Sequence, residues 1–408
     1  MVSNGQDMSV RGKVEQNGQT EKKGYTYTPG VEIKIVVAVV FLMAFGLIMI
    51  FSASSYTSSI SRVTNYDSAY YFKKQLKVMA LGVIIAAFLN WVPYKLIKKC
   101  GILAYVISLV LIVMLKTPLG INSGGATRWL NLGFMQLQVA DATKVCMIVF
   151  MGWYVNRFWK EFDKFRYTLL LVALQAGLIL KISSNLSSCL ILMLMVFILT
   201  FIVGKHPKMH LIIAAVGIVM IVIFIMWLKA NMPLDSEMDK YPYQIRRFFG
   251  WLDPERYAGT LGYQPLQSLY AIGSGGLLGK GLGNGTQKLS NIPEAQNDMI
   301  FAIICEELGL IGVIIMFLMF GYLLYQMVIV VKESRNIYAS VVVIGVILHI
   351  IFQIIVNVCV AVNFFPNTGV SLPFISAGGS AIICTLMEIG LVIGIRRQQV
   401  NRKYSRIS

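Results

Sequence analysis

About ten apolar runs divide this chain, and they limit its fold more than any other feature. A helix needs roughly 17 to 25 apolar residues to cross the hydrocarbon core of a bilayer, and most of the runs approach that length. Only 13% of the 408 residues are charged and 57% are hydrophobic, unlike the composition of a water-soluble domain. Because backbone polar groups inside a bilayer must bond within helices or a closed barrel, the runs predict an all-α polytopic membrane protein.

Short charged segments and a few long polar loops separate the predicted spans. In chain order the spans are 31–51, 77–92, 101–115, 143–154, 167–180, 186–203, 211–228, 299–331, 339–362 and 380–395. The largest loop, 229–298, lies between spans seven and eight. The eighth run is longer than a bilayer requires, so it predicts a helix that is tilted, kinked or extended beyond the bilayer. The uncharged loop 363–379 predicts a re-entrant segment before the last span.

The distribution of basic residues predicts the orientation of the chain. The short Lys/Arg clusters fall inside the cell, as the positive-inside rule requires, if both termini are cytoplasmic. Residues 1–30 predict a disordered cytoplasmic tail, 31–395 a single transmembrane domain, and 396–408 a basic cytoplasmic tail. The net charge of +17 sits in short loops and the tail, which favours contact with anionic lipid and no binding of nucleic acid.

Asp298 stands at the junction between the largest loop and the eighth span. A carboxyl group at that depth loses part of its hydration, which raises its pKa and makes it a candidate functional group. A structural interpretation is equally good, because Asn297 and Asp298 are both favourable N-cap residues for the next helix. Glu294 precedes Asp298 by four residues, so the two carboxylates share one face if the helix begins early enough.

The residues of the largest loop restrict its chemistry. Residues 229–297 contain no His and no Cys, which excludes Ser-His or Cys-His catalysis and a His-rich zinc site within them. The six cysteines of the chain lie in or beside apolar runs, which predicts inert thiols. The glycine-rich run 274–281 lacks the first Gly and the final Ser/Thr of a nucleotide-binding loop. It predicts either a backbone cradle for a lipid pyrophosphate or a tightly packed loop that needs small residues.

Several polar residues interrupt the apolar runs. They are Lys144, Glu306, Glu307, Glu388 and a stripe of His349, Gln353 and Asn357. The stripe residues recur every fourth position and therefore share one helix face. Hydrogen bonds between helices explain the stripe more simply than transport or catalysis does. Lys144, near the outer end of its span, would extend to the interface or bind an anion.

Longer motifs show a resemblance to a known family. They are FSASSY from Phe51, YYFKKQ from Tyr70, GATRWLNLG from Gly125, YQPLQSLYAIGSGGLLGKGLGNGTQKL from Tyr263, IPEAQNDMIFAIICEELGLIG from Ile292 and PNTGVSLPFISAGGSA from Pro366. With these motifs in this order, the chain resembles the SEDS family (shape, elongation, division and sporulation), which includes FtsW, RodA and SpoVE. The resemblance covers nearly all of the chain after the N-terminal tail, and GLGNGTQKL is more similar to the FtsW/SpoVE branch.

The resemblance implies a processive peptidoglycan glycosyltransferase of the bacterial cell membrane. It would polymerise lipid II at the outer face during division, sporulation or elongation. A class B penicillin-binding protein and other divisome or elongasome membrane proteins would be its partners. The family's catalytic residue falls on Asp298, which would act as general base on the acceptor sugar's 4-hydroxyl. The implied substrate-binding residues are Glu294, Lys144, Asp141, Arg128, Asn185 and Lys288, of which Lys144 and Arg128 would neutralise the leaving pyrophosphate.

Departures from the family pattern predict a divergent member. Asp141 replaces a Glu, Asn185 an Asp, Gln296-Asn297 a His-Thr pair and Ala377 a Tyr. Two alternatives to the enzyme stay open: a lipid II flippase, and a non-catalytic scaffold for a penicillin-binding protein. A divalent cation, Mg²⁺ or Mn²⁺, would bridge a carboxylate and the pyrophosphate, although no ligand cluster in the sequence identifies one.

Overall fold

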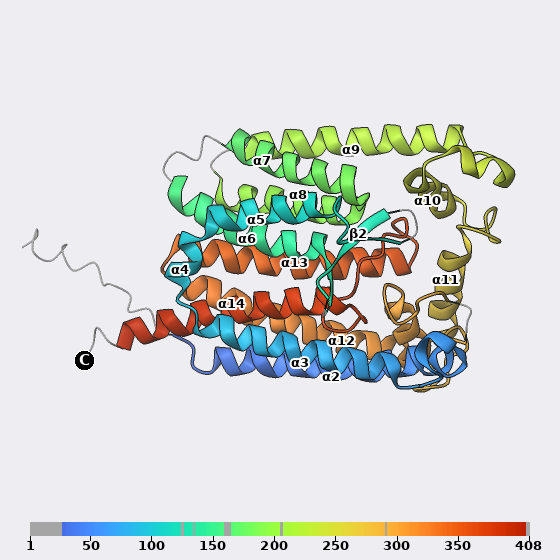
Figure 1. The fold of residues 1–408 in the computed structure, drawn as a ribbon, viewed down its shortest axis with the longest axis horizontal. Helices are drawn as coiled ribbons and strands as arrows, with labels where there is room; N and C mark the ends of the chain where they lie inside the picture. The colour runs from blue at the N-terminus through green and yellow to red at the C-terminus, as the bar shows by residue number, and fades with distance from the viewer. Residues whose placement is uncertain are drawn as a thin grey trace, which may run out of the picture.

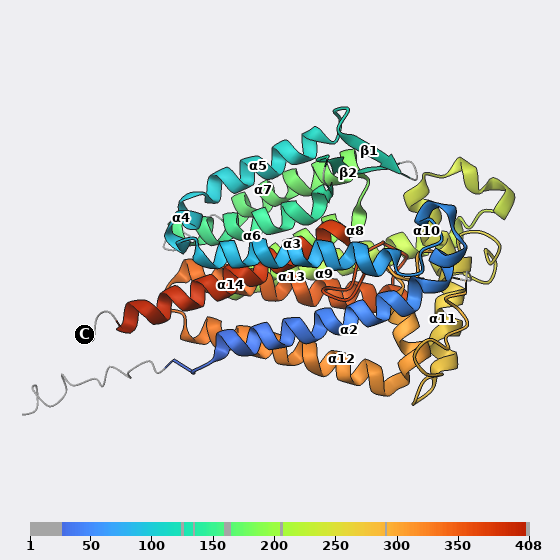
Figure 2. The same ribbon diagram turned by 60° about the horizontal axis from the view of Figure 1, so that its bottom comes forward.

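Most of the chain is helical, and the long helices lie side by side along one axis of the molecule (Figures 1 and 2). The computed structural model describes residues 27–123, 126–133, 135–158, 165–204, 207–289 and 292–404. Its long helices are α2 (Val31–Ile60), α3 (Tyr70–Trp91), α5 (Gly101–Met114), α6 (Val139–Phe158), α7 (Phe165–Leu178), α8 (Leu186–Val203), α9 (Pro207–Ala230), α12 (Ile300–Glu333), α13 (Ile337–Ala361) and α14 (Gly379–Tyr404). The shorter ones are η1 (Arg62–Thr64), α4 (Tyr94–Lys99), η3 (Ile179–Ser183), η4 (Asp235–Lys240), α10 (Tyr243–Leu252) and α11 (Tyr263–Gly275).

The long helices coincide with the apolar runs of the sequence. Six of those described are long and apolar enough to cross a membrane: α2, α8, α9, α12, α13 and residues 379–401 of α14. The segments Gly101–Met114 and Tyr167–Ser183 are apolar but shorter. This confirms the prediction of an all-α, multi-pass membrane protein, whereas the number of spans and their orientation stay predictions. α9 leaves apolar side chains such as Ile218 and Met226 exposed, as a helix in contact with lipid would.

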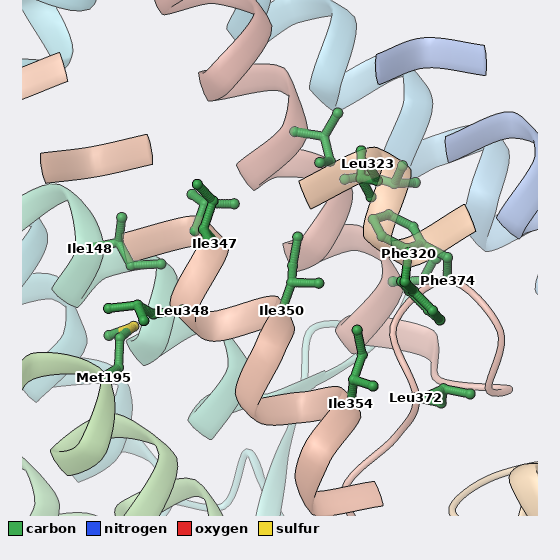
Figure 3. Packing of buried hydrophobic residues seen from close by; sticks show 14 of the residues in the cluster. Ile148, Met195, Phe320, Leu323, Ile347, Leu348, Ile350, Ile354, Leu372 and Phe374 are labelled. Atoms are coloured by element: carbon green, nitrogen blue, oxygen red, sulfur yellow. The ribbon is translucent and has the colours of Figure 1, made fainter. Parts of the chain in front are cut away.

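α13 occupies the middle of the bundle (Figure 3). Its buried residues Ile347, Ile350 and Ile354 belong to one hydrophobic core. The labelled side chains packed around them come from α6, α8, α12 and the segment between α13 and α14: Ile148, Met195, Phe320, Leu323, Leu372 and Phe374. This packing fixes the far end of α13, where Asn357 lies, relative to the loops that follow.

A small antiparallel sheet forms within the loop 116–142, which the sequence analysis treated only as a polar loop. Its strands are β1 (Gly120–Ser123), β2 (Ala126–Asn131) and β3 (Gln136–Gln138), in the order β1-β2-β3. Ala126 and Leu130 of β2 are buried, so even this short strand has an inner face. The sheet, α10 and α11 gather at the end of the molecule opposite the C-terminus (Figures 1 and 2).

α12 is interrupted at Gly309, where φ is 63°, and the glycine-rich run fills the interruption. The N–H groups of Lys280 and Gly281 donate to the carbonyls of Glu306 and Glu307. In return, the carbonyls of residues 276 and 277 accept from the N–H groups of residues 310 and 311. A Cβ on Gly279 would lie 2.2 Å from the Glu307 carbonyl oxygen, so the approach requires glycine. The predicted kink is therefore present, and the run 274–281 is the tightly packed loop.

α14 continues past the predicted end of its span, because it runs to Tyr404 while the basic tail was predicted from residue 396. Arg396 is 1% exposed and pairs with Glu333 at the end of α12. Its Nη2 donates to the Thr28 carbonyl at 3.0 Å. Arg396 is thus part of the helix packing. Most of the predicted N-terminal tail, residues 1–26, lies outside the described residues.

Candidate functional site

Asp298 lies in the turn that leads into α12, at the end of the molecule that carries α10 and α11. The N-cap of α12 is Met299, with no side-chain capping bond, so Asp298 does not act as the cap. Its side chain is half-buried. Among the described residues, no other side chain donates a hydrogen bond to its carboxylate. The main chain of Gly369 passes close by, since a Cβ built there would lie 3.9 Å from Asp298 Oδ2.

The surroundings of Asp298 raise the pKa of its carboxyl to about 6. Loss of hydration is the main cause, and the negative charge of Glu294 is the second. Its own backbone N–H and the positive charge of Arg247 act in the opposite direction. At neutral pH the group is therefore an ionised carboxylate with more affinity for a proton than an ordinary aspartate.

Glu294 lies beside Asp298 but not on a shared helix face, because α12 begins only at Ile300. The condition for a common face, an early helix start, is not met, because residues 293–299 form turns. Glu294 is exposed, has a φ of 50°, and accepts a hydrogen bond from Asn297 Nδ2 at 2.9 Å. The negative charge of Glu294 raises the pKa of the Asp298 carboxyl, which lies four residues later in the same turn.

The segment 363–378, between α13 and α14, holds the turn that carries Asp298. The Ala377 N–H donates to the Gln296 carbonyl at 2.9 Å. Asn357 of α13 donates from Nδ2 both to the Asp298 carbonyl and to the Val370 carbonyl, each at 2.8 Å. The acid is thus positioned by contacts from parts of the chain distant from it in sequence.

A pocket opens between β2, the start of α8, α10 and the segment 363–378. Its lining residues are Arg128, Ser184, Asn185, Leu186, Ser187, Gln244, Arg247, Phe248, Pro366, Asn367 and Thr368. Arg247 Nη1 donates to the Asn367 carbonyl at 3.1 Å. Asn185 caps α8 by accepting from the Ser188 N–H at 3.1 Å. Two arginines with amide and hydroxyl groups make a lining suited to an anionic, oxygen-rich ligand.

Asp141 and Lys144 form a buried ion pair in the first two turns of α6. Lys144 Nζ lies 2.8 Å from Asp141 Oδ1, and the two side chains are 2% and 7% exposed. The Gln138 N–H donates to Ser380 Oγ at 2.9 Å, which joins the start of α6 to the start of α14. The pair does not line the arginine pocket.

Lys288 is also buried in an ion pair. Its Nζ lies 2.6 Å from Glu307 Oε1 and donates to Ser52 Oγ at 3.0 Å. The neighbouring Glu306 pairs with Lys280 at 2.7 Å and accepts from the Thr286 N–H at 2.9 Å. Lys288 is thus placed to hold the segment that follows the glycine-rich run 274–281 against α12. Its role in substrate binding stays a prediction.

One residue of the polar stripe on α13, His349, pairs with the acid on α14. His349 Nδ1 lies 2.7 Å from Glu388 Oε1, and both side chains are buried. Gln353 and Asn357 continue the stripe and are buried as well. These contacts agree with the structural interpretation of the stripe.

The sequence analysis had missed Arg247 and Asn357 as candidate site residues. Arg247 was missed because its loop, 229–298, carries equal numbers of basic and acidic residues, so no positive cluster marks it. Only the amphipathic pattern of residues 243–252 distinguishes the helix that carries Arg247 from the rest of the loop. Asn357 was treated as part of a structural stripe. Within the described ranges, no group of three or more His, Cys, Asp or Glu residues could hold a metal ion, so the divalent cation stays a prediction.

Comparison with known proteins gives matches along nearly the whole chain. A model of the FtsW/RodA/SpoVE family, described as "Cell cycle protein", matches residues 33–401. The probable peptidoglycan glycosyltransferase FtsW of Coxiella burnetii is 32% identical over 377 residues, covering 90% of this chain and 96% of that protein. The stage V sporulation protein E of Bacillus subtilis is 30% identical over 371 residues, covering 90% of this chain and 97% of that protein.

Two solved structures share the fold. A chain from a peptidoglycan synthase complex gives a TM-score of 0.71 at 24% identity, covering 92% of this chain and 98% of that chain. The rod shape determining protein RodA of Thermus thermophilus gives a TM-score of 0.61 at 22% identity, covering 91% of this chain and 97% of that chain. The family match spans most of the sequence and the fold agrees with it. The chain therefore belongs to the FtsW/RodA/SpoVE family of cell cycle proteins, the SEDS family.

Proposed function

We propose that the protein is a peptidoglycan glycosyltransferase that polymerises lipid II at the outer face of the cytoplasmic membrane. The observation that carries the proposal is the setting of Asp298, a carboxylate without a side-chain donor in the described structure, near a pocket lined by Arg128 and Arg247. The name of the Coxiella relative supports peptidoglycan glycosyl transfer, and the name of the Bacillus relative supports a role in sporulation.

Asp298 acts as the general base. It removes the proton from the 4-hydroxyl of the acceptor sugar while that oxygen attacks the anomeric carbon of the donor. The new C–O bond forms as the bond from the anomeric carbon to the pyrophosphate oxygen breaks, so the configuration inverts. A carboxylate whose pKa is about 6 is ionised at neutral pH and is a stronger base than an ordinary aspartate.

The arginine pocket binds the pyrophosphate of the leaving lipid carrier. Negative charge builds on that group as the bond breaks, and guanidinium groups stabilise it with paired hydrogen bonds. Arg247 is within electrostatic reach of Asp298, because it lowers the pKa of that carboxyl. The segment 363–378 also joins the two, because its residues 366–368 line the pocket and a Cβ built on Gly369 would lie 3.9 Å from Asp298 Oδ2. This arrangement supports assigning the base and the leaving-group site to one reaction. Lys144 and Asp141 lie outside this pocket, and we assign them no step.

The flippase alternative depended on the polar stripe and the acids within the spans. Glu306, Glu307 and Glu388 each pair with a basic partner, and the stripe residues are buried between helices. The pairs provide a structural role for the three acids and for His349, so they lend no support to transport. The scaffold alternative is an outcome of the test below. We expect a class B penicillin-binding protein as partner and both termini in the cytoplasm.

The decisive assay is glycan polymerisation from purified lipid II. The protein is purified with and without a co-expressed class B penicillin-binding protein, and wild type is compared with Asp298→Asn. We expect polymer from wild type and a loss of about 10²–10⁴-fold in rate for Asp298→Asn, the usual contribution of a general base. Full activity of Asp298→Asn would reject the base. Partner binding without polymer under any condition would favour the scaffold, and lipid II movement in liposomes without polymer would favour the flippase.

Arg246 and Arg247 provide a matched pair for testing the pocket. Arg247 lines the pocket, whereas Arg246 pairs with the exposed Asp239 and does not line it. Loss of a charge-assisted hydrogen bond costs about 1.5–3 kcal/mol, so we expect Arg247→Gln to lower kcat/KM by about 10- to 100-fold. Arg246→Gln is expected to stay within about twofold of wild type. Equal losses in the two variants would reject the pyrophosphate pocket.

A further inference from the structure

Asn357 connects the turn that carries the candidate base to the segment 363–378. It lies in the last turns of α13 and is 1% exposed. Its two amide hydrogens have two acceptors, the main-chain carbonyls of Asp298 and Val370, each 2.8 Å from Nδ2. Both donors of the side chain are therefore used, and both bonds go to segments that border the site.

The chemistry of these contacts determines the orientation of the amide. A carbonyl oxygen accepts and cannot donate, so only the NH₂ end of Asn357 can face two carbonyls. The other end, Oδ1, is buried without a partner in the described part of the chain. Leaving a buried acceptor unpaired is costly, so the two donated bonds must offset that cost.

The two carbonyls belong to segments that must keep a fixed separation if the site is to work. Asp298 carries the base, while residues 367 and 368, adjacent to Gly369 and Val370, line the arginine pocket. Gly369 itself approaches the carboxyl, as the 3.9 Å contact of its constructed Cβ shows. Because Asn357 donates a hydrogen bond to the turn of Asp298 and to the segment 363–378, it sets the distance between the base and the segment that borders the pocket.

We propose that Asn357 is a positioning residue for the transfer reaction, which holds the Asp298 main chain and the Val370 main chain in one fixed arrangement. The inference rests on the proposed function, because it assigns Asn357 a role only through Asp298. Asn357 touches main-chain atoms of the site and takes no part in the bonds that form or break. A misplacement of about 1 Å between reacting groups lowers a rate by about 10²-fold, which makes such a grip valuable.

The test compares Asn357→Leu with Gln353→Leu in the lipid II assay. Gln353 is a matched control, because it is buried on the same stripe one turn away and, within the described residues, makes no hydrogen bond to either segment. We expect Asn357→Leu to lower kcat by about 10- to 100-fold while KM changes less than about threefold. Gln353→Leu is expected to keep kcat within about threefold. Should Asn357→Leu fail to fold, Asn357→Ser and Gln353→Ser carry the same comparison, since Ser keeps one donor.

The pH profile of polymerisation distinguishes a positioning role of Asn357 from a packing role. Its acidic limb is the range in which the rate falls as Asp298 becomes protonated. The charges that face the Asp298 carboxyl are Glu294, on its own turn, and Arg247, from α10, while the segment 363–378 carries no charged residue. If Asn357 holds the carboxyl in its half-buried setting, its loss lets the group hydrate. The pKa of Asp298 then falls, so the acidic limb moves to lower pH although the plateau is lower. An unmoved limb, or equal losses in the two Leu variants, would overturn the inference.

The proposed function and this inference fail in different ways. Asp298→Asn in the same assay distinguishes them. If Asp298→Asn is inactive while Asn357→Leu has the maximal rate and the acidic limb of the wild type, the glycosyltransferase proposal is kept. The positioning role of Asn357 is then rejected. If Asp298→Asn polymerises normally, the base is wrong, and the positioning role is rejected with it.

Discussion

Asp298 precedes the first residue of α12 and the pair Glu306–Glu307 lies within its first three turns, yet the surroundings of these acids differ. Glu307 accepts from Lys288, Ser52 and the Gly283 N–H, and Glu306 is similarly surrounded. Asp298 receives no side-chain donor among the described residues and has a raised pKa. The comparison separates acids that hold the fold from an acid that is available for chemistry, because only an unneutralised carboxylate keeps its affinity for a proton.

The largest effect on the fold is expected from breaking the Lys288–Glu307 pair. Lys288→Met removes the charge that neutralises Glu307 at a site where the two side chains are 4% and 0% exposed. Removing one partner of a buried pair costs about 3–5 kcal/mol, because the other charge is left uncompensated. Denaturation in mixed SDS micelles should show a loss of that size in the free energy of unfolding.

Lys280→Met is the matched control for Lys288→Met. Lys280 is 31% exposed, and Glu306 keeps bonds from Thr286 and Gln287 when the lysine is gone. We therefore expect a smaller loss, about 1–2 kcal/mol, because the remaining hydrogen bonds to the buried Glu306 carboxylate offset part of the lost pairing. Equal losses in the two variants would contradict the distinction between a buried pair and a partly hydrated one.

A smaller effect of opposite sign is expected for Asp298→Asn. Above pH 6 the folded protein keeps a carboxylate ionised where ionisation is unfavourable, and the neutral amide removes that cost. With allowance for its partial exposure, the gain should be about 1–2 kcal/mol at pH 8. The same denaturation assay measures it, beside the loss expected for Lys288→Met.

The pH dependence of this gain follows from the direction of the pKa shift. The pKa of Asp298 is raised from 3.8 to about 6, so the folded state binds the proton more tightly than the unfolded state. The wild type is therefore favoured below about pH 4 and loses that stability as the pH rises through about 6. The advantage of Asp298→Asn should appear over this window, and a constant difference from pH 4 to pH 8 would contradict the raised pKa.

The sequence predicted much of the fold because its spans depend on local composition. The apolar runs matched helices, and the excess length of the eighth run left a kink among the predicted alternatives, without its position at Gly309. The sheet 120–138 was missed because its strands are too short for a strong alternating pattern. The helical end of α14 was missed because Arg396 is buried by distant partners, Glu333 and Thr28, which no local pattern indicates.

The candidate site was predicted less completely, because it is assembled from distant segments. The position of Asp298 at a membrane junction suggested its raised pKa, which depends mostly on local burial. Arg247 and Asn357 act through residues about 50 to 60 positions away or more, such as Asp298 and Asn367. Spacing in the sequence carries no information about such contacts. The start of α12 at Ile300 likewise depends on the packing of the turn before it. Because the helix starts there, Glu294 and Asp298 share no helix face.

The smallest expected effect comes from Glu294, whose charge is the second cause of the raised pKa of Asp298. Glu294→Gln keeps an acceptor for Asn297 Nδ2 and removes only the charge. The pKa of Asp298 should fall, so the acidic limb of polymerisation should move to lower pH with an unchanged plateau. Because Glu294 is exposed, salt screens its charge, and the difference from wild type should shrink between about 0.05 and 0.5 M salt. A limb that moves to higher pH would mean that Glu294 stabilises the ionised base, and a lower plateau would give Glu294 the substrate-binding role that the family resemblance implies.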